Sequence, residues 1–299
     1  MKMRRSEILF LYDVKWGNPN GDPMDENKPR MDENTDTLIV SDVRLKRTIR
    51  DYLKDYYNET LWVSGKAVTP ESRKKELEID SKEDAVKKCI DIRLFGAVIP
   101  SKGKGAVETS LTGPVQFRYG RSLHKVKWQF IQGTAAFLSR EGTEQRSFRE
   151  EYIVPYVLIA FYGVINDKNA EITKLTESDV EKMLEAMWYG TKNLITRSKM
   201  EQNPRFLMKI DYKEGVKFHH GELDYLISLT SDKDDYEIRD IIDFKIELAP
   251  LMNSLAKIKN IIEKINYKID ERLTFTQNGE TKSFEEIFSD FLTEELRLE

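Results

Sequence analysis

Basic side chains recur near the N-terminus in a pattern that suits the binding of an anion. Arg44, Lys46, Arg47 and Arg50 follow Ser41 within the stretch VSDVRLKRTIRDYL. Guanidinium and ammonium groups neutralise phosphates, and residues three or four apart share a flank of a helix. The pattern indicates either a surface that grips a nucleic-acid backbone or a solvated helix face, which is what most charge runs are.

The same stretch predicts the helix that would carry these cations. Leu45, Ile49 and Leu53 recur at helical spacing, and Ser41 or Asp42 suits the N-cap. One flank of this helix is therefore expected to pack, while the other can hold something anionic.

A polar loop precedes the helix and supplies amide side chains. Glu7 to Trp16 is apolar on both faces, which predicts a buried strand, and Gly17 to Pro23 (GNPNGDP) is rich in turn formers. Asn18 and Asn20 in this loop either bond RNA or cap the turn. A buried strand, a polar loop and a basic helix form the first half of a βαβ unit, and such loops often carry function.

Composition limits the class of protein. The net charge is −4, but residues 1–150 hold 28 basic and 23 acidic side chains, against 20 and 29 in the remainder. A basic zone on an acidic body can be an electrostatic footprint for a polyanion. The single cysteine, Cys89, excludes an intrachain disulfide and a cysteine-rich zinc site. Because no apolar run approaches a membrane span or a signal peptide, we expect a cytoplasmic protein without membrane contact.

The remaining patterns predict an α+β fold. Gly113 to Arg121 alternates, with Val115, Phe117 and Tyr119 expected on one buried face. The further predicted elements are a protruding hairpin (Ser122 to Glu151), a central strand (Tyr152 to Ile165), a helix (Thr176 to Ile195) and a strand (Arg205 to Tyr212). In the acidic C-terminal third, the patterns predict a strand (Leu223 to Leu229), a long helix (Leu248 to Ile269) and a final helix (Phe284 to Leu296).

With the interruptions after the first helix and after Arg121 set aside, the order is strand, helix, strand, strand, helix, strand. This is the ferredoxin-like arrangement that RNA recognition modules share, although many unrelated proteins use it as well. Phe10, Tyr12 and Phe117 are expected in the core of this sheet rather than as platforms for stacked bases.

Five runs carry a resemblance to a known family: LYDVKWGNPNGDP, VSDVRLKRTIRDYL, RLFGAVIP, LTGPVQFRYGRS and VPYVLIAFYGVI. The chain resembles the RAMP superfamily proteins that form the backbone of CRISPR Cascade complexes, most closely the Csh-type subunit of type I-B systems, with the Csd-type of type I-C next. The resemblance covers about residues 6–210. It implies a non-enzymatic subunit, without metal or cofactor, that polymerises along a guide RNA (crRNA) and presents it for pairing with target DNA.

The resemblance also implies a hand-like division of the chain and a set of partners. The expected parts are the first half of the palm (1–54), a fingers insertion (55–112), a palm strand (113–121), a thumb hairpin (122–151), the second half of the palm (152–213) and a helical C-terminal extension (214–299). The expected partners are crRNA, target DNA through the guide, neighbouring copies in a helical filament and other Cascade subunits.

Carried over residue by residue, the resemblance assigns RNA contacts to three regions. Ser41, Arg44, Lys46, Arg47 and Arg50 match the segment that grips phosphate. Asn18 and Asn20 lie in the loop motif. Arg118 and Arg121 lie on or beside the palm face, where phosphate contact competes with an internal ion pair.

The thumb is expected to carry a wedge that separates stacked bases, which needs apolar side chains beside basic ones. Phe137, Leu138 and Phe148 fit the apolar part. Arg140, Arg146 and Arg149 fit the basic part. The same apolar residues could instead pack the hairpin against the palm.

Two other functions stay open. Related type III backbone subunits cut RNA with an acidic residue after the first strand. This chain has four aspartates in that region: Asp22, Asp25, Asp32 and Asp36. One such carboxylate bound to a divalent ion could serve as a catalytic centre for RNA cleavage. The second alternative function is that of a generic RNA-binding scaffold. The histidines lack metal-binding spacing, and no Walker loop, nucleophile elbow or HExxH occurs.

Overall fold

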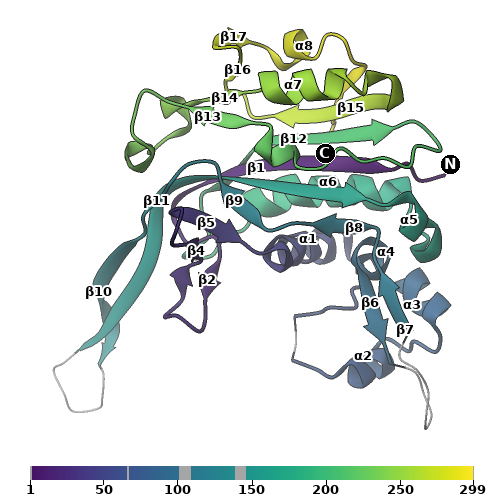
Figure 1. The fold of residues 1–299 in the computed structure, drawn as a ribbon. Helices are drawn as coiled ribbons and strands as arrows, with labels where there is room; N and C mark the ends of the chain where they lie inside the picture. The colour runs from purple at the N-terminus through teal and green to yellow at the C-terminus, as the bar shows by residue number, and fades with distance from the viewer. Residues whose placement is uncertain (1, 66, 101–108, 139–145, 299) are drawn as a thin grey trace.

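The computed structural model describes residues 2–65, 67–100, 109–138 and 146–298, and a large sheet runs through its centre (Figure 1). Within these residues the sheet has the strand order β18-β15-β12-β1-β11-β9-β5-β4, with β8 and β10 also paired to β11. Its central strands are β1 (Ser6–Gly17), β11 (Arg146–Ile165) and β12 (Gln202–Tyr212). β1 lies antiparallel between β11 and β12, as its apolar sequence on both faces predicts.

The predicted strand from Gly113 to Arg121 is in fact two short strands, β8 (Val115–Phe117) and β9 (Gly120–Ser122). Both pair with β11, and the chain bends between them. The bend turns Tyr119 outward, so that it is 64% exposed rather than buried beside Val115 and Phe117. Phe10, Tyr12 and Phe117 are buried, which confirms that they belong to the core.

Two helices cover one face of the sheet. α1 (Asp42–Tyr57) buries Leu45, Ile49 and Leu53, and α6 (Glu177–Lys192) begins with a capping box formed by Thr176 and Asp179. Both predicted helices are confirmed. Ser41 is the N-cap residue of α1 but makes no side-chain cap hydrogen bond. The short helix α5 (Asp167–Thr173) follows β11.

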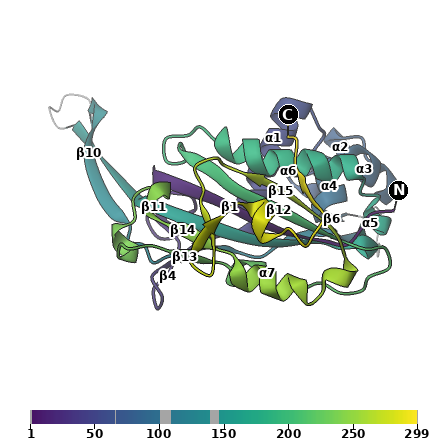
Figure 2. The ribbon, with the colours of Figure 1, turned by 90° about the horizontal axis from the view of Figure 1, so that it is seen from above.

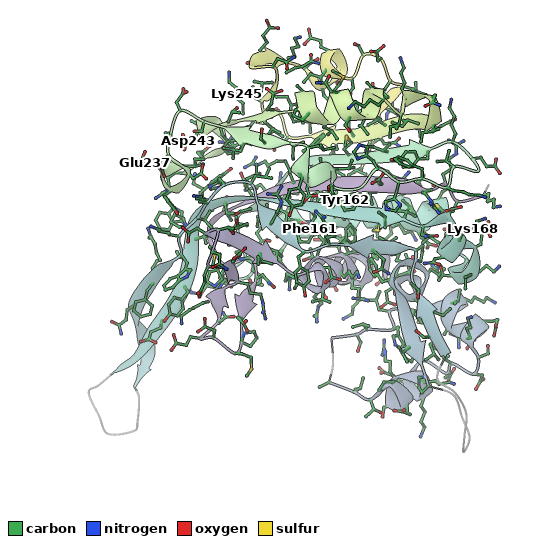
Figure 3. The ribbon with its side chains drawn as sticks, viewed as in Figure 1. Phe161, Tyr162, Lys168, Glu237, Asp243 and Lys245 are labelled. Carbon is green, nitrogen blue, oxygen red and sulfur yellow. The ribbon has the colours of Figure 1, made fainter. Side chains whose placement is uncertain are left out.

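The C-terminal third covers the opposite face of the sheet (Figures 1 and 2). Successive residues of β11 point to the two layers: Phe161 packs in the helix-side core and Tyr162 in the C-terminal core (Figure 3). Tyr162 and Tyr212 donate their hydroxyl hydrogens to the buried Glu7 carboxylate, which also accepts the backbone N–H groups of His220 and Gly221, both at 2.7 Å. The face that RNA recognition modules leave open is therefore closed in this chain.

The expected helical character of the C-terminal extension is wrong. Its elements are β13 (Ser228–Thr230), β14 (Lys245–Glu247), α7 (Ala249–Ala256), β15 (Ile262–Ile269), β16 (Phe275–Gln277), β17 (Glu280–Lys282), α8 (Phe284–Ile287) and β18 (Thr293–Glu295), with 3-10 turns such as Leu223–Tyr225 (η1) and Lys259–Ile261 between them. The predicted helix from Leu248 to Ile269 ends at Ala256. Its second half is rich in β-branched isoleucine and extends the main sheet as β15 beside β12. The predicted final helix is likewise reduced to α8, and the predicted strand from Leu223 to Leu229 to η1 and β13.

Two further parts extend from opposite ends of the sheet on the same side of the body (Figure 1). The first contains α2 (Pro70–Glu76), α3 (Lys82–Lys88), α4 (Ile90–Phe95), β6 (Gly96–Ile99) and β7 (Thr109–Thr112). It has a small core of its own, which includes Trp62, Val86 and Ile92. The second is the predicted hairpin, in which β10 (Gln129–Leu138) pairs with the first half of β11.

Four short strands lie between β1 and α1: β2 (Gly21–Asp22), β3 (Lys28–Pro29), β4 (Met31–Asp32) and β5 (Thr37–Val40). β5 pairs with β9 and leads directly into Ser41 and α1. Across the described part of the chain, none of the helices has the length and apolar character needed to span a bilayer.

Candidate nucleic-acid interface

Arg44 on α1 and Lys199 in the loop after α6 are half-buried cations that lie close together. Arg44 Nη2 donates to Thr48 Oγ1 at 2.9 Å, and Lys199 Nζ to Ser198 Oγ at 3.4 Å. Burial lowers the pKa of the Arg44 guanidinium. Burial, reinforced by the positive charge of Arg44, lowers the pKa of Lys199. Among the described residues neither cation forms an ion pair with a carboxylate, since Asp51, whose charge acts on Arg44, is bonded to Arg47. A bound anion would therefore relieve an unfavourable electrostatic arrangement.

The loop after β1 is pinned against the loop that carries Lys199. The backbone N–H of Asn18 donates to Ser198 O at 2.6 Å. A Cβ at Gly17 would lie 2.9 Å from the same oxygen, so the close approach requires glycine. The two loops therefore form one surface beside the start of α1.

Asn18 and Asn20 are buried in this surface rather than extended from it. Asn18 Nδ2 donates to the carbonyls of Asn27 and Tyr152 at 2.7 and 3.2 Å, and Asn20 Oδ1 accepts from Ser41 Oγ at 3.5 Å. Among the described residues, Asn18 Oδ1, Asn20 Nδ2 and Gln202 Nε2 are buried polar atoms without a partner. The two amides thus hold the loop in shape, which is the turn-capping alternative. Asn18 Oδ1 and Asn20 Nδ2 keep the capacity for one further hydrogen bond each.

Lys46 and Arg50, to which the resemblance assigns RNA contacts, lie on the inner side of α1. Lys46 is 9% exposed, and its Nζ donates to Asp42 at 3.0 Å. Arg50 Nε donates to the buried Asp91 at 2.9 Å, and its guanidinium lies over the Phe95 ring at 5.1 Å. The helical turn directs both cations toward α4, where they join the fingers segment to the sheet.

Arg47 does face outward. Its Nε donates to both carboxylate oxygens of Asp51 at 2.7 and 2.8 Å, in an exposed pair. Gly65 has φ +76°, and a Cβ there would lie 2.5 Å from Arg47 Nη1. The positive φ is what favours glycine at position 65, because the flexible end of the Arg47 side chain could move aside.

Arg118 and Arg121 form the internal ion pair that the sequence left as an alternative. Arg118 Nη2 donates to both oxygens of Asp224 at 2.7 and 2.9 Å, and Arg121 Nη2 donates to the Asp224 carbonyl at 2.7 Å. Asp224 lies in η1, more than 100 residues later in the chain. No local sequence signal could have revealed this partner.

The structure gives only backbone positions for most of the expected wedge residues. Leu138 lies opposite Arg146, Phe148 opposite Thr134, and Arg149 opposite Gly133 in the ladder. Phe137 also lies in β10, whereas Arg140 lies outside the described residues.

An aromatic cluster missed by the sequence analysis lies at the root of the hairpin. The Tyr152 ring contacts Trp128 and Phe130, with centroids 5.0 and 5.1 Å away, and Phe130 is 46% exposed. Lys28 Nζ lies 5.4 Å from the Tyr152 centroid. Trp128 and Phe130, two positions apart in the run WQF, were the available signal.

The acidic residues of the loop region are engaged separately. Asp22 pairs with Arg30 at 2.8 Å, Asp25 pairs with Lys28 at 2.7 Å, and Asp36 accepts from the hydroxyl of Tyr236. Asp32 Oδ1 accepts from the backbone N–H of Asn34 at 3.1 Å. Within the described ranges, no three metal-binding side chains gather at one point.

Comparisons with known proteins agree with the resemblance. Residues 4–249 match the family described as CRISPR-associated protein Cas7. The CRISPR-associated protein Cas7 of Haloferax volcanii is 30% identical, over 96% of this chain and 93% of that protein.

Two solved chains share the fold. One, from a structure titled CRISPR RNA-guided surveillance complex, has a TM-score of 0.55 at 14% identity and covers 89% of each chain. Another, titled CRISPR RNA-guided surveillance complex, pre-nicking, has a TM-score of 0.50 at 10% identity and covers 96% of this chain and 98% of that chain. On the family match and the identity to the archaeal protein, this chain belongs to the Cas7 family of CRISPR-associated proteins.

Proposed function

We propose that this chain is a guide-RNA-binding backbone subunit of a CRISPR Cascade surveillance complex. It binds the sugar-phosphate backbone of crRNA, polymerises along it with neighbouring copies and leaves the bases free to pair with target DNA. It works in the cytoplasm, carries no catalytic centre and contacts other Cascade subunits. The observation that carries the proposal is the pair of half-buried cations without carboxylate partners, Arg44 and Lys199.

The site suits backbone binding rather than base reading. A sequence-independent grip requires phosphate neutralisation and shape, as in other RNA-guided systems. The covered sheet face offers no platform for bases, because the C-terminal third packs on it. Arg47 extends the cationic surface along α1, whereas Lys46 and Arg50 support the helix from its inner side.

The hand-like division of the chain is part of the proposal. The strand order β12-β1-β11-β9, with two helices on one face, supports a ferredoxin-like palm. The separate core of residues 55–112 supports a fingers subdomain, and the projecting hairpin of residues 122–151 supports a thumb. Arg146, Phe148, Arg149, Phe137, Leu138 and Arg140 remain the candidates for the wedge.

The test is a double variant, Arg44→Gln with Lys199→Gln, measured against single-stranded RNA over a range of salt concentrations. Each lost phosphate contact lowers the slope of log K against log salt by about 0.7 on a single strand, so the double variant should lose about 1.4. The matched control is Lys213→Gln with Lys257→Gln, which removes the same charge from exposed positions outside the guide surface. Equal affinity and slope in both double variants would overturn the proposal.

A further inference from the structure

A groove of about 780 Å³ lies between the bend after β8, the β4–β5 segment and η1 of the C-terminal third. Its walls come from three distant parts of the sequence, which meet only in the folded chain. Asp42, at the first position of α1, lines it. The preceding residue, Ser41, bonds Asn20 of the proposed guide surface at 3.5 Å, so the groove adjoins that surface.

One wall of the groove is aromatic and cationic. Tyr119 and Tyr225 are 64% and 59% exposed, so part of each ring is open to a ligand. The Arg121 guanidinium lies 4.0 Å from the centroid of the Tyr225 ring, and that of Arg118 lies 5.1 Å from it. Such a wall offers stacking surfaces beside positive charge.

Asp224 fixes the geometry of this wall. Its carboxylate is 1% exposed and holds both guanidinium groups, whose side chains are 41% and 25% exposed. Two cations share one buried anion, so the wall keeps a net positive charge. Arg118 reaches Asp224 through Nη2, which leaves Nε and Nη1 for an anion from outside. Asp224 is therefore a positioning residue supplied by the C-terminal third.

The other lining residues include hydrogen-bond acceptors. Asp32 and Asp42 line the groove together with threonine side chains and Ile39. Asp42 is partly neutralised by Lys46 at 3.0 Å, and Asp32 lies in the short, half-buried strand β4. These carboxylates would repel a phosphate but accept hydrogen bonds from hydroxyl or amino groups.

A ligand that satisfies both sets of lining residues has an anionic end, a flat aromatic ring and hydrogen-bond donors on its other edge. These are the features of a nucleotide. We propose that the groove binds one nucleotide of single-stranded RNA, with its phosphate at Arg118, its base against Tyr119 and Tyr225, and its ribose hydroxyl or base amino group toward Asp32. This inference rests on the proposed function and assigns the acidic C-terminal third a part in RNA binding.

The test uses the full chain and a single-stranded RNA that contains 4-thiouridine. Irradiation should give crosslinks that map to Tyr119 or Tyr225 by mass spectrometry. The double variant Tyr119→Leu with Tyr225→Leu should bind the same RNA about 5-fold or more weakly, because stacking on each base is lost. Phe218→Leu, which replaces a 42% exposed aromatic residue outside the groove, is the matched control and should bind as the parent chain does.

Salt dependence separates this proposal from the previous one. Loss of stacking should lower affinity by a similar factor at every salt concentration, whereas loss of Arg44 and Lys199 should change the slope. Crosslinks confined to other residues, together with unchanged affinity of the tyrosine variant, would overturn the groove and leave the guide surface standing. A tyrosine variant that binds RNA normally but no longer associates with its own copies would mean that the groove holds a second protomer, which also overturns the proposal.

Discussion

Arg47 and Arg50 lie three residues apart on α1 and have different surroundings. Arg47 forms an exposed pair with Asp51, at side-chain exposures of 46% and 39%. Arg50 forms a buried pair with Asp91, at 12% and 1%. Asp91 also accepts the backbone N–H groups of Trp62 and Val63 at 2.7 and 3.0 Å, so Arg50 stabilises the connection between α1 and the fingers segment.

Replacement of Arg50 by alanine should therefore reduce stability rather than RNA affinity. It leaves the buried Asp91 carboxylate without its cation, which costs about 3 kcal/mol of the free energy of unfolding. Arg47→Ala removes an exposed pair and should cost about 0.5 kcal/mol or less. Urea denaturation of both variants checks the difference. Equal destabilisation would contradict the assigned roles.

The positions of these side chains could be predicted only in part. Helical periodicity in α1 and the turn formers after β1 are local signals, so the sequence identified the right helix and loop. The partners of Arg50 and Arg118 lie 41 and 106 residues away, and their spatial proximity is decided by tertiary packing. Lys199 was missed for the same reason, because its loop meets α1 only after β12 has joined the sheet.

At the scale of elements, the root of the hairpin is joined to the C-terminal third by a buried histidine. His124 is 5% exposed, and its Nε2 accepts from the backbone N–H of Leu158 at 3.3 Å. Its Nδ1 donates to the carbonyls of Lys125 and Asp235, at 3.0 and 3.2 Å. These contacts require the neutral ring, because a protonated Nε2 cannot accept a hydrogen bond.

The stability of the chain should fall as the pH drops below the ordinary histidine pKa of 6.5. Burial lowers the pKa of His124, although the two carbonyls oppose the shift. Between pH 6.5 and that lower value the unfolded chain binds a proton that the folded chain does not, so its contribution to stability is lost with acidification. Thermal unfolding between pH 7.5 and 5.5 should show the decline. His124→Asn should show a weaker pH dependence, and an identical dependence in both proteins would refute this role.

Elements were predictable where the hydrophobic period was unambiguous. α1 and α6 each show one helical period over 16 residues, and β1 is a short run that is apolar on both faces. The stretch from Lys257 to Ile269 was predicted as helix because Ile258, Ile262 and Ile265 recur at helical spacing, although β-branched isoleucine also suits a strand. This segment forms a strand because it pairs with the edge of β12. A local sequence pattern does not report a pairing partner that lies in another part of the chain.

At the scale of the whole molecule, the C-terminal third closes the sheet with charged as well as apolar contacts. Arg205 on β12 donates to Asp13 at 2.8 Å and to Asp270 at 2.9 Å, and Lys15 pairs with Asp240 at 2.8 Å. The two ends of the chain are thus tied across the sheet. The hairpin and the fingers segment extend to one side of this body (Figure 1).

The proposed function predicts assemblies whose mass depends on guide length. The chain alone should remain small, and addition of a crRNA should give particles whose mass rises in equal steps as the spacer is lengthened. Size-exclusion chromatography with light scattering measures this directly. A single particle size for all guide lengths would argue for an isolated RNA-binding scaffold instead.

The unbroken course of β11 has a consequence for such assemblies. This strand runs for 20 residues, roughly 65 Å at about 3.3 Å per residue, with its second half in the ladder with β1 and its first half in the hairpin. A change in the direction of the hairpin would therefore require a bend in β11 where the two ladders meet. In the proposed assembly the hairpin of each protomer would contact a neighbouring copy. The length and direction of β11 would then set a constant distance between copies along the guide.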